Sequence, residues 1–249
     1  GDVWPESIRA VGASRHEGLL DLLEKVELFL YRRAAAVISV TNAFKTNLVS
    51  RGIDPSKISV VTNGVDSTRF STREKDRNLC REHQLEGRFV AGYIGTLGMA
   101  HGLQTLVEAA AIIAGKPGSL PITLVILGDG AERDKLKALA QERRADNILF
   151  IDSVPKQEVA RYWSILDISV VHLKKTEIFK TVIPSKLFEC MAMGVPILLG
   201  VEGESAQIVL ENGVGWAFEP ENAAELAACL ERLCEVPDLG RATGGRGPA

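Results

Sequence analysis

The sequence IPSKLFECMAMGVP at positions 183–196 predicts a loop, a short helix and then a buried strand over 195–199. Pro184 and Ser185 fit the start of the helix, because serine caps free amide groups and proline is excluded from a helix interior. Gly194 and the proline two residues later fit its end. A short helix that leads directly into a buried apolar strand is typical of a parallel sheet covered by helices.

The start of this helix carries a lysine and a glutamate one turn apart. Lys186 and Glu189 are at positions i and i+3, so both side chains can face the same side. A helix N-terminus with a cation suits a phosphate, and a neighbouring carboxylate suits sugar hydroxyls. The pattern therefore favours a nucleotide-sugar site. A solvated surface ion pair explains the same two residues, so the choice depends on the rest of the chain.

The chain alternates strands and helices beyond residue 88. Apolar strands are predicted at 89–94, 122–127, 148–151, 168–171, 195–199 and 216–218. Helices are predicted at 103–114, 132–143, 155–166, 184–194, 206–210 and 223–234. Strand–helix repeats with continuous apolar strands predict an α/β fold, in which a Rossmann-like parallel sheet has helices on both faces.

The first part of the chain predicts a smaller, partial domain. It contains an apolar helix at 17–34, a strand at 35–40, a helix at 42–51 and a strand at 58–61. The wide apolar face of the first helix fits either packing against a sheet or contact with a membrane surface. We place the domains at 1–70 and 71–236, followed by an irregular or truncated tail at 237–249. Because the chain begins at Gly1 without methionine, we expect a fragment of a longer protein.

Several loops follow the predicted strands directly. They lie at 95–102, 128–130, 152–155 and 173–185. Because the carboxyl ends of parallel strands meet at one edge of the sheet, these loops are expected to form one crevice. The glycine pattern of 95–102 matches neither the dinucleotide fingerprint nor the Walker motif, so it indicates either backbone approach to a ligand or simple turns. The Gly-Asp-Gly sequence at 128–130 is typical of a strand-to-helix turn.

Composition excludes several classes of protein. The formal net charge of −3 over 249 residues gives no electrostatic reason to expect nucleic acid. No apolar run reaches the roughly 20 residues of a membrane span, and no signal peptide is visible. The four cysteines form no CxxC pair and have no histidine at ligand spacing, so we expect reduced thiols in a cytoplasmic protein and no metal site.

Five motifs together resemble the retaining glycosyltransferases of family 4, also called group 1, which have the GT-B fold. The resemblance covers nearly the whole chain and depends on the order and spacing of the motifs. They are Asn63-Gly64-Val65-Asp66, the loop 95–102 followed by Leu103-x-x-Leu106-x-x-Ala109, Leu127-Gly128-Asp129-Gly130, Val154-Pro155-x-x-Glu158, and the stretch 183–196. Residues 2–7 and Pro184-Ser185-Lys186-x-x-Glu189 look most like the bacterial branch that builds surface polysaccharides and O-antigen units from UDP-activated amino sugars such as N-acetylfucosamine.

The resemblance implies two Rossmann-like domains facing across a cleft. This chain would hold the donor domain and only the last part of the acceptor-side domain, so we do not expect activity from it alone. The expected substrate is a UDP-sugar, with no other cofactor and no metal, and the expected acceptor is lipid-linked or a saccharide. Transfer would proceed with retention, in the cytoplasm or peripherally at the inner face of the plasma membrane. The absence of an Asp-x-Asp sequence agrees with metal-independent transfer.

Roles in the family carry over to particular positions. Glu189 matches the second glutamate of the family's Glu-x7-Glu motif, which holds the ribose, whereas the first falls at Thr181. The family's contact to the donor sugar is therefore in doubt here. The arginine and lysine that clamp the diphosphate in the family fall at Thr96 and His101. We infer that Lys186 and the backbone amides of Ser185 and Lys186 neutralise the phosphates instead.

The resemblance implies further contacts with the donor. The backbone of Gly95, Thr96 and Gly98 would approach the phosphates near Pro184, and Ser153 and Val154 would lie against the uracil. Asp2 falls near the catalytic polar residue of the N-terminal domain.

Two other functions fit the same sequence. One is a non-catalytic nucleotide-sugar-binding module, in which Thr96, His101 and Thr181 mark lost catalytic function. The other is a GT-B nucleotide-sugar epimerase, which would need acids and histidines from both domains.

Overall fold

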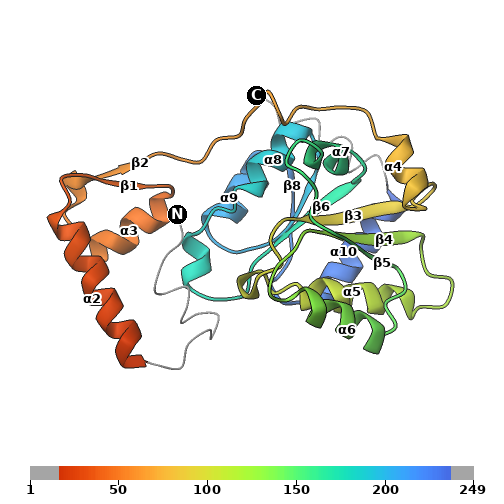
Figure 1. Ribbon diagram of the computed structural model, residues 1–249, viewed down its shortest axis with the longest axis horizontal. Coiled ribbons are helices and arrows are strands. Elements are labelled where there is room, and N and C mark those ends of the chain that lie inside the picture. Colours follow the sequence, from red (N-terminus) through yellow and green to blue (C-terminus); the bar gives the residue numbers. More distant parts are fainter. Residues whose placement is uncertain (1–16, 237–249) are drawn as a thin grey trace.

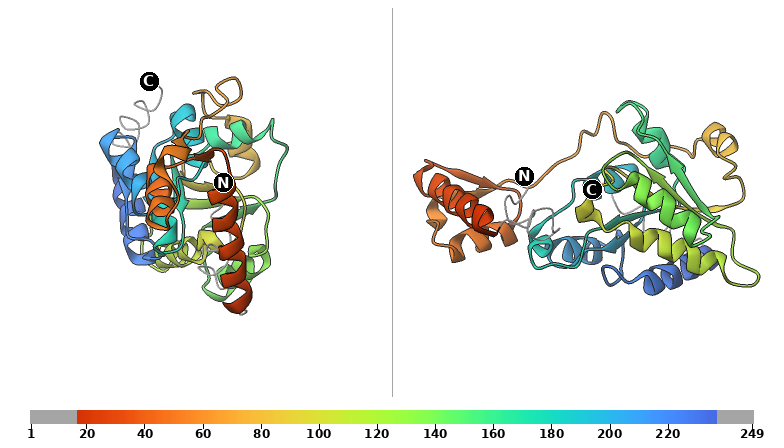
Figure 2. Two further views of the ribbon diagram at one scale, coloured as in Figure 1. Left: turned by 90° about the vertical axis from the view of Figure 1, so that its left-hand side faces the viewer. Right: turned by 60° about the horizontal axis from the view of Figure 1, so that its bottom comes forward.

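The computed structural model describes residues 17–236, which form a small N-terminal unit and a larger α/β domain. Residues 61–76 join the two without regular helix or strand and run along one side of the molecule (Figure 1; Figure 2 shows two further directions). The predicted tail at 237–249 and Asp2 lie outside the described residues. The domain limits expected from sequence stay a prediction.

The α/β domain contains a six-stranded parallel sheet. Its order in space is β5-β4-β3-β6-β7-β8, with every neighbouring pair parallel. The strands are β3 (Phe89–Ile94), β4 (Ile122–Leu127), β5 (Ile148–Ile151), β6 (Ile168–His172), β7 (Ile197–Gly200) and β8 (Gly215–Ala217). This confirms the predicted Rossmann-like parallel sheet.

Helices cover both faces of the sheet. One face packs against α5 (Gln104–Ala114), α6 (Arg133–Glu142) and α10 (Ala223–Glu235), and the other against α7 (Val159–Ser164), α8 (Lys186–Met193) and α9 (Glu204–Glu211) (Figure 1). Strand β3 shows why both faces are needed. Val90 and Ile94 belong to the core under α7–α9, whereas Ala91 and Tyr93 belong to the core under α5, α6 and α10. Successive side chains of a strand point to opposite faces, so an apolar run must be buried twice.

The strand order contains a topological switch point between β3 and β6. From β3 the chain moves outward to β4 and β5, and it then returns beside β3 and moves the other way through β7 and β8. The chain after β3 therefore leads to helix α5 on one face of the sheet, and the chain after β6 leads to helix α8 on the other. In open α/β sheets, ligands bind at the carboxyl edge beside such a switch point.

The N-terminal unit is small. It contains two parallel strands, β1 and β2. Its core is formed by the buried side chains Val37, Leu48, Ile53 and Ile58. The elements are α2 (Glu17–Arg33), β1 (Val37–Ser39), α3 (Asn42–Ser50), the 3-10 helix η1 (Pro55–Lys57) and β2 (Ile58–Val60).

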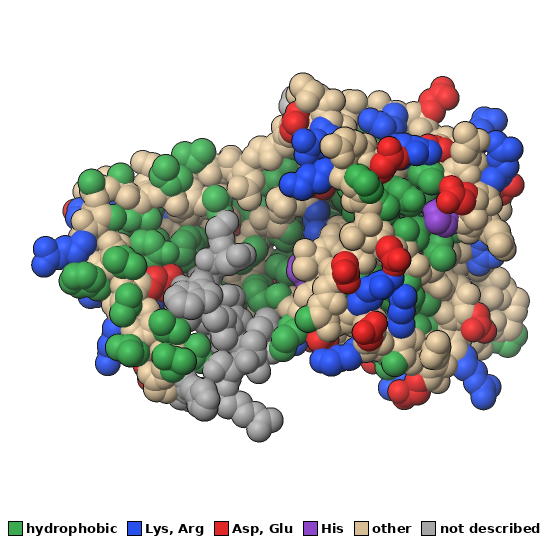
Figure 3. Space-filling view, in the orientation of Figure 1, with side chains coloured by type: hydrophobic (Ala, Val, Ile, Leu, Met, Phe, Trp, Pro, Cys, Tyr) green, Lys and Arg blue, Asp and Glu red, His purple; other side chains and the backbone are tan. Residues whose placement is uncertain are grey.

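Helix α2 is predicted correctly, but much of its apolar face is exposed. Apolar side chains gather on the surface of this unit, at the left of Figure 3. Those of α2 that are 46–60% exposed are Leu19, Leu22, Val26, Phe29 and Leu30. Packing of this face against a sheet is therefore not seen in the described structure.

Three local predictions are wrong or incomplete. The helix expected from Pro155 begins only at Val159, because residues 156–158 form a turn. The strand expected from Val195 begins at Ile197, after Pro196, which has no amide to donate to a ladder. The loops after β3 and β6 contain the unpredicted 3-10 helices η2 (Met99–His101) and η3 (Ile178–Thr181).

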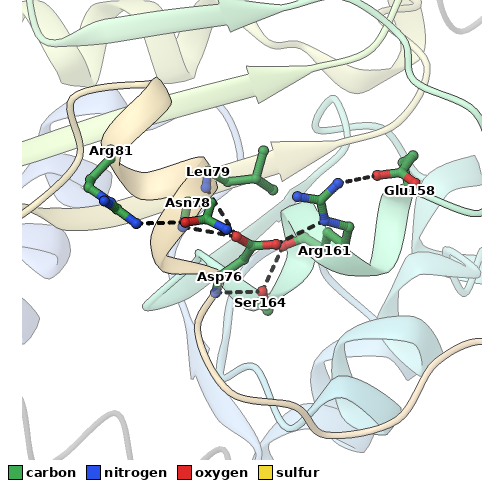
Figure 4. A network of polar contacts seen from close by, with 7 residues as sticks. All are labelled: Asp76, Asn78, Leu79, Arg81, Glu158, Arg161 and Ser164. Atoms are coloured by element: carbon green, nitrogen blue, oxygen red, sulfur yellow. Dashed lines mark hydrogen bonds and ion pairs between the residues drawn. The ribbon is translucent and has the colours of Figure 1, made fainter.

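The connecting segment is fixed to the α/β domain at its far end. Asp76 accepts hydrogen bonds from the amides of Asn78 and Leu79, which caps helix α4 (Arg77–Glu82), and it pairs with Arg161 Nε at 2.8 Å (Figure 4). Arg161 also pairs with Glu158 at 2.6 Å. Glu158, part of a motif of the resemblance, therefore has a structural role here.

Candidate functional site

A cleft of about 1150 Å³ lies at the carboxyl edge of the sheet. Its walls come from the N-terminal unit, the connecting segment and the loops after β3, β4, β5 and β6. Every donor-binding residue predicted from sequence lines it, namely Gly95, Thr96, Gly98, His101, Ser153, Val154, Pro184, Ser185, Lys186 and Glu189. The fold brings these residues together from distant parts of the sequence, and their role in binding stays a prediction.

The loops after β3 and β4 are held together by their backbones. The amide of Gly95 donates to Leu127 at 2.9 Å, and the amide of Leu97 donates to Asp129 at 2.8 Å. Gly128 has a φ of +145°, and a Cβ there would collide with the carbonyl group of Gly95. Beyond making a turn, this glycine lets the loop after β3 lie close enough to form the cleft wall.

The ammonium group of Lys186 is buried beneath the loop after β3. Its Nζ lies 3.6 Å from the centre of the Tyr93 ring, and a Cβ on Gly95 would lie only 2.9 Å from Nζ. Within residues 17–236 this nitrogen is inaccessible to solvent and has no hydrogen-bond partner, although other parts of the residue are partly exposed. Burial lowers the pKa of Lys186 to about 7, against the raising effect of Cys190 and Glu189.

This environment excludes the solvated surface pair as an explanation of Lys186 and Glu189. Among residues 17–236, no carboxylate lies within 4.0 Å of the Lys186 nitrogen. Glu189 itself is half-buried at the cleft wall. Burial raises the pKa of its carboxyl group, whereas the charge of Lys186, the indole of Trp163 and the charge of Arg69 lower it. Arg69 reaches the cleft from the connecting segment.

Ser185 does not cap helix α8, so this prediction is wrong. Its backbone is already helical, with φ −58° and ψ −30°, and its side chain makes no capping bond. The amides of Leu187 and Phe188 donate to Pro184 and Ser185. In the described part of the chain, the amides of Ser185 and Lys186 have no such partner. Two free donors therefore remain at this helix start, beside the lysine.

His101 is a neutral group in this cleft. Burial, together with the charge of Lys186, lowers its pKa to about 4. Its ring lies edge-on to Tyr93, with centroids 5.8 Å apart, and its Nδ1 lies 3.3 Å from the carbonyl oxygen of Gly98. His101 therefore cannot replace the fixed charge that the family places at this position.

His172 was not predicted from sequence. Its Nε2 accepts the amide of Glu221 at 2.9 Å, so its Nδ1 carries the proton and donates to the carbonyl oxygen of His101 at 2.6 Å. The ring also stacks on Phe218. His172 thus fixes the loop that carries His101. A polar residue at the carboxyl end of an apolar strand is the signal that could have identified it.

The hydroxyl groups of Thr181 and Thr41, which also line the cleft, both donate hydrogen bonds within the protein. The hydroxyl of Thr181 donates to the carbonyl of Ile178 at 2.7 Å. Thr41, which caps helix α3, donates its hydroxyl to the carbonyl of Thr181 at 2.8 Å. Position 181 therefore supplies no carboxylate and instead joins η3 to the N-terminal unit.

Metal-binding clusters and membrane-spanning helices are both absent from the described residues. Within residues 17–236, no three histidine, cysteine or acidic side chains are grouped so that they could hold a metal ion. None of the described helices is long and apolar enough to cross a membrane.

Family models match both parts of the chain. Residues 75–247 match the model described as glycosyl transferases group 1, and residues 8–69 match the one described as glycosyltransferase family 4. Among curated proteins, the probable glycosyltransferase WbjE of Pseudomonas aeruginosa is 23% identical over 239 residues, which cover 94% of this chain and 58% of that protein. The amylovoran biosynthesis glycosyltransferase AmsK of Erwinia amylovora is 25% identical, covering 83% and 49%. The chain spans about half the length of the curated relatives it matches.

Solved structures show the same fold. Alr3699/HepE of Anabaena, in complex with UDP and glucose, superposes with a TM-score of 0.75 at 23% identity, covering 90% of this chain and 60% of that one. The C-terminal domain of LpcC from Francisella tularensis gives a TM-score of 0.60 at 23% identity, covering 74% and 94%. These likenesses confirm the predicted fold, a Rossmann-like parallel sheet of the GT-B type with part of a second Rossmann-like domain.

Proposed function

The chain belongs to the glycosyl transferases of group 1, and we propose that it is the donor-binding part of an enzyme that transfers a sugar from a UDP-sugar with retention. We propose further that the product is a cell-surface polysaccharide. The names of the relatives support this, since they include transferases of amylovoran and colanic acid biosynthesis.

The observation that carries this proposal is the buried side-chain nitrogen of Lys186, which has no polar partner among residues 17–236. An unpaired charge inside a protein costs several kcal/mol, so such groups are normally paired or neutral. The nitrogen faces a glycine-bordered loop at the switch point of the sheet, beside two free amides at a helix start. A diphosphate at this position would accept from both amides and supply the missing counter-charge.

The remaining contacts follow from this placement. With the diphosphate against Gly95, Thr96 and the start of α8, the carboxylate of Glu189 is available to the ribose hydroxyls. The uracil would lie against Ser153 and Val154, which line the same cleft.

During transfer, negative charge grows on the departing diphosphate. Lys186 and the start of helix α8 would stabilise that charge, which is the form of catalysis expected of fixed donors and dipoles. The acceptor would attack on the face that the diphosphate leaves, and a departing phosphate oxygen would take the acceptor's proton.

An N-acetylated amino sugar is the donor sugar that we propose. Its support is the Pro184-Ser185-Lys186-x-x-Glu189 sequence, together with an apolar cleft wall formed by Phe44, Met99 and Phe179. A lipid-linked acceptor fits the exposed apolar face of α2, which would place the enzyme at the inner surface of the plasma membrane. Full-length enzyme assayed with a panel of UDP-sugars tests the choice of sugar.

A non-catalytic nucleotide-sugar-binding module is the second candidate function. It is favoured by Thr181, which replaces a carboxylate, and by the neutral His101. Turnover of any UDP-sugar by the full-length enzyme would exclude it.

Calorimetry with UDP and uridine tests the donor site. Lys186→Ala should weaken UDP binding by about 10- to 100-fold and leave uridine unchanged, because it removes a charge-assisted contact of about 1.5–3 kcal/mol. Glu189→Ala should weaken both ligands through the ribose. Lys135→Ala, which removes a lysine exposed to 74%, is the matched control. An equal loss of uridine and UDP affinity in Lys186→Ala would show that the phosphates do not lie there.

A further inference from the structure

Lys186 has no counter-ion among the described residues 17–236, and we propose that a nucleotide sugar binds together with one proton, which is taken up by the Lys186 amine. The inference rests on the proposed function, because it requires the diphosphate to reach this nitrogen. The amine's lone pair takes a proton from solvent as the donor enters, and the ammonium returns it when the nucleotide leaves.

The first support is the set of groups that face the nitrogen from β3 and from the loop after it. The Tyr93 ring lies 3.6 Å away, and the Tyr93 hydroxyl already donates to the carbonyl of Thr96 at 2.8 Å. Burial raises the pKa of Tyr93 far above its usual range, so it supplies no phenolate. Gly95 presents only backbone. An aromatic face attracts a cation, but this attraction is smaller than the cost of burying an unpaired ammonium.

The second support comes from the other titratable groups nearby. His101 in η2 is neutral at pH 7. On α8, burial raises the pKa of the Cys190 thiol to about 12, so it carries no charge either. Glu189 is the remaining acid on this helix, and it forms no ion pair with Lys186 within 4.0 Å. The charge of Arg69, from the connecting segment, acts on Glu189 as well. In the described part of the chain, no partner therefore holds a proton on Lys186 before the donor binds, and its pKa of about 7 agrees with this geometry.

Donor binding reverses this balance. The diphosphate of a nucleotide sugar is a diester that carries two negative charges and does not titrate near neutral pH. Placed against the nitrogen, it favours the ammonium form strongly. Binding and protonation are then linked, so each strengthens the other by the same factor. At pH values above the pKa that Lys186 has in the donor-free protein, donor affinity should fall about tenfold for each pH unit.

Calorimetry of the 249-residue chain tests the inference. UDP-glucose and UDP-N-acetylglucosamine are titrated at pH 8 in two buffers of different ionisation enthalpy, which gives the number of protons taken up. We expect uptake of about one proton for each bound donor and a tenfold weaker affinity at pH 9 than at pH 8. Uridine has no phosphates and should bind without uptake. UDP itself is avoided, because its terminal phosphate titrates near neutral pH.

Two variants identify the group that takes up the proton. Lys186→Arg stays charged at every pH, so it should bind without proton uptake and with little pH dependence. His101→Asn changes a residue of the predicted donor site, but the number of protons taken up for each bound donor should stay at about one. The inference would be overturned if Lys186→Arg still took up a proton with the donor. It would also be overturned if His101→Asn bound the donor without proton uptake.

If Lys186→Arg does not bind because arginine does not fit the site, measurements on the wild-type protein still distinguish proton uptake from the proposed donor site. Binding of UDP-sugars without uptake and without pH dependence would overturn this inference alone. Failure of both UDP-sugars to bind at any pH between 6 and 9 would overturn the proposed donor site itself.

Discussion

The carbonyl oxygen of His101 lies 2.6 Å from the imidazole Nδ1 of His172, although the two residues are 71 positions apart. His101 lies in the loop after β3, and His172 is the last residue of β6. These two strands flank the switch point of the sheet. This buried ring therefore ties the loop after β3 to the end of β6, and the amide of Lys174 adds a second tie by donating to the carbonyl of Ala100 at 2.9 Å. The same ring reaches Glu221 through its second nitrogen.

Replacing His172 by alanine should destabilise the fold and weaken donor binding. The change leaves a buried carbonyl unpaired and a cavity beside Phe218, which should lower the free energy of unfolding by about 2–4 kcal/mol. Urea denaturation measures this loss. His172→Asn keeps an N–H donor near the position of Nδ1 and should recover part of it. If both variants unfold like the wild type, the ring does not hold the loop.

A methyl group at Gly128 should separate the two loops that form the cleft wall. Both Gly128 and Gly118 have positive φ values, +145° and +68°, but only at Gly128 would the new Cβ collide with backbone, at Gly95. We expect Gly118→Ala to cost about 1 kcal/mol of stability through strain alone. Gly128→Ala should cost clearly more and should reduce UDP affinity, as measured by denaturation and calorimetry. Equal effects of the two substitutions would contradict the close approach of these loops.

The sequence allowed the strand and helix ranges to be predicted because the strands are continuous apolar runs bounded by turn residues. Residues 89–94, 122–127 and 148–151 were predicted to the residue. The order of strands in space was not predicted, since β6 returns beside β3 rather than beside β5. That return creates the switch point, and no local pattern encodes it.

The candidate site shows the same division. Lys186 and Glu189 could be identified from their spacing and from the family resemblance, but the burial of the ammonium could not. It depends on Tyr93, whose ring meets the lysine only in the folded protein. The predicted cap at Ser185 failed because the backbone of this residue is already helical, whereas a capping serine normally has an extended backbone.

Glu204 should hold the N-terminal unit to the α/β domain. Glu204 is the first residue of helix α9. Its carboxylate accepts hydrogen bonds from the amide of Ala43 at 2.9 Å and from the amide of Asn42 at 3.4 Å, at the start of α3. Glu204→Ala removes a carboxylate from a helix N-terminus, which should cost about 0.5–2 kcal/mol. Limited proteolysis within 61–76 should become faster. Glu211→Ala on the same helix is the control, and equal cleavage rates for the two variants would argue against this contact.

Asp76 should make stability depend on acid pH. The amide of Leu79 and the side chain of Arg161 are the main causes that lower the pKa of its carboxyl group below the usual range. The stabilisation is therefore complete above the unfolded pKa of 3.8 and is lost as the pH falls through the lower, folded pKa. Asp76→Asn should thus be less stable than the wild type at pH 7, and the difference should narrow below pH 4. Thermal unfolding across this range measures it, and a constant difference would contradict the assignment.

The exposed face of α2 provides the last prediction. Leu19, Leu22, Val26 and Phe29 follow one another at spacings of three and four residues, and they form a stripe that is 46–57% exposed. Arg32 and Arg33 lie at the end of the helix, where they could meet acidic headgroups. If this stripe contacts a membrane, the chain should float with vesicles that contain acidic phospholipid, and less so in high salt.

The double variant Leu22→Gln/Phe29→Gln should abolish that flotation. Both side chains are more than half exposed, so the fold should lose no more than about 0.5 kcal/mol per substitution. Leu210→Gln, at a leucine exposed to 55% on α9, should leave flotation unchanged. The wild-type chain could instead fail to float with vesicles and form oligomers, while the double variant is monomeric. That result would identify the stripe as a protein contact. Because the wild-type chain floats with vesicles in one case and forms oligomers without them in the other, one set of flotation and gel-filtration measurements decides between the two.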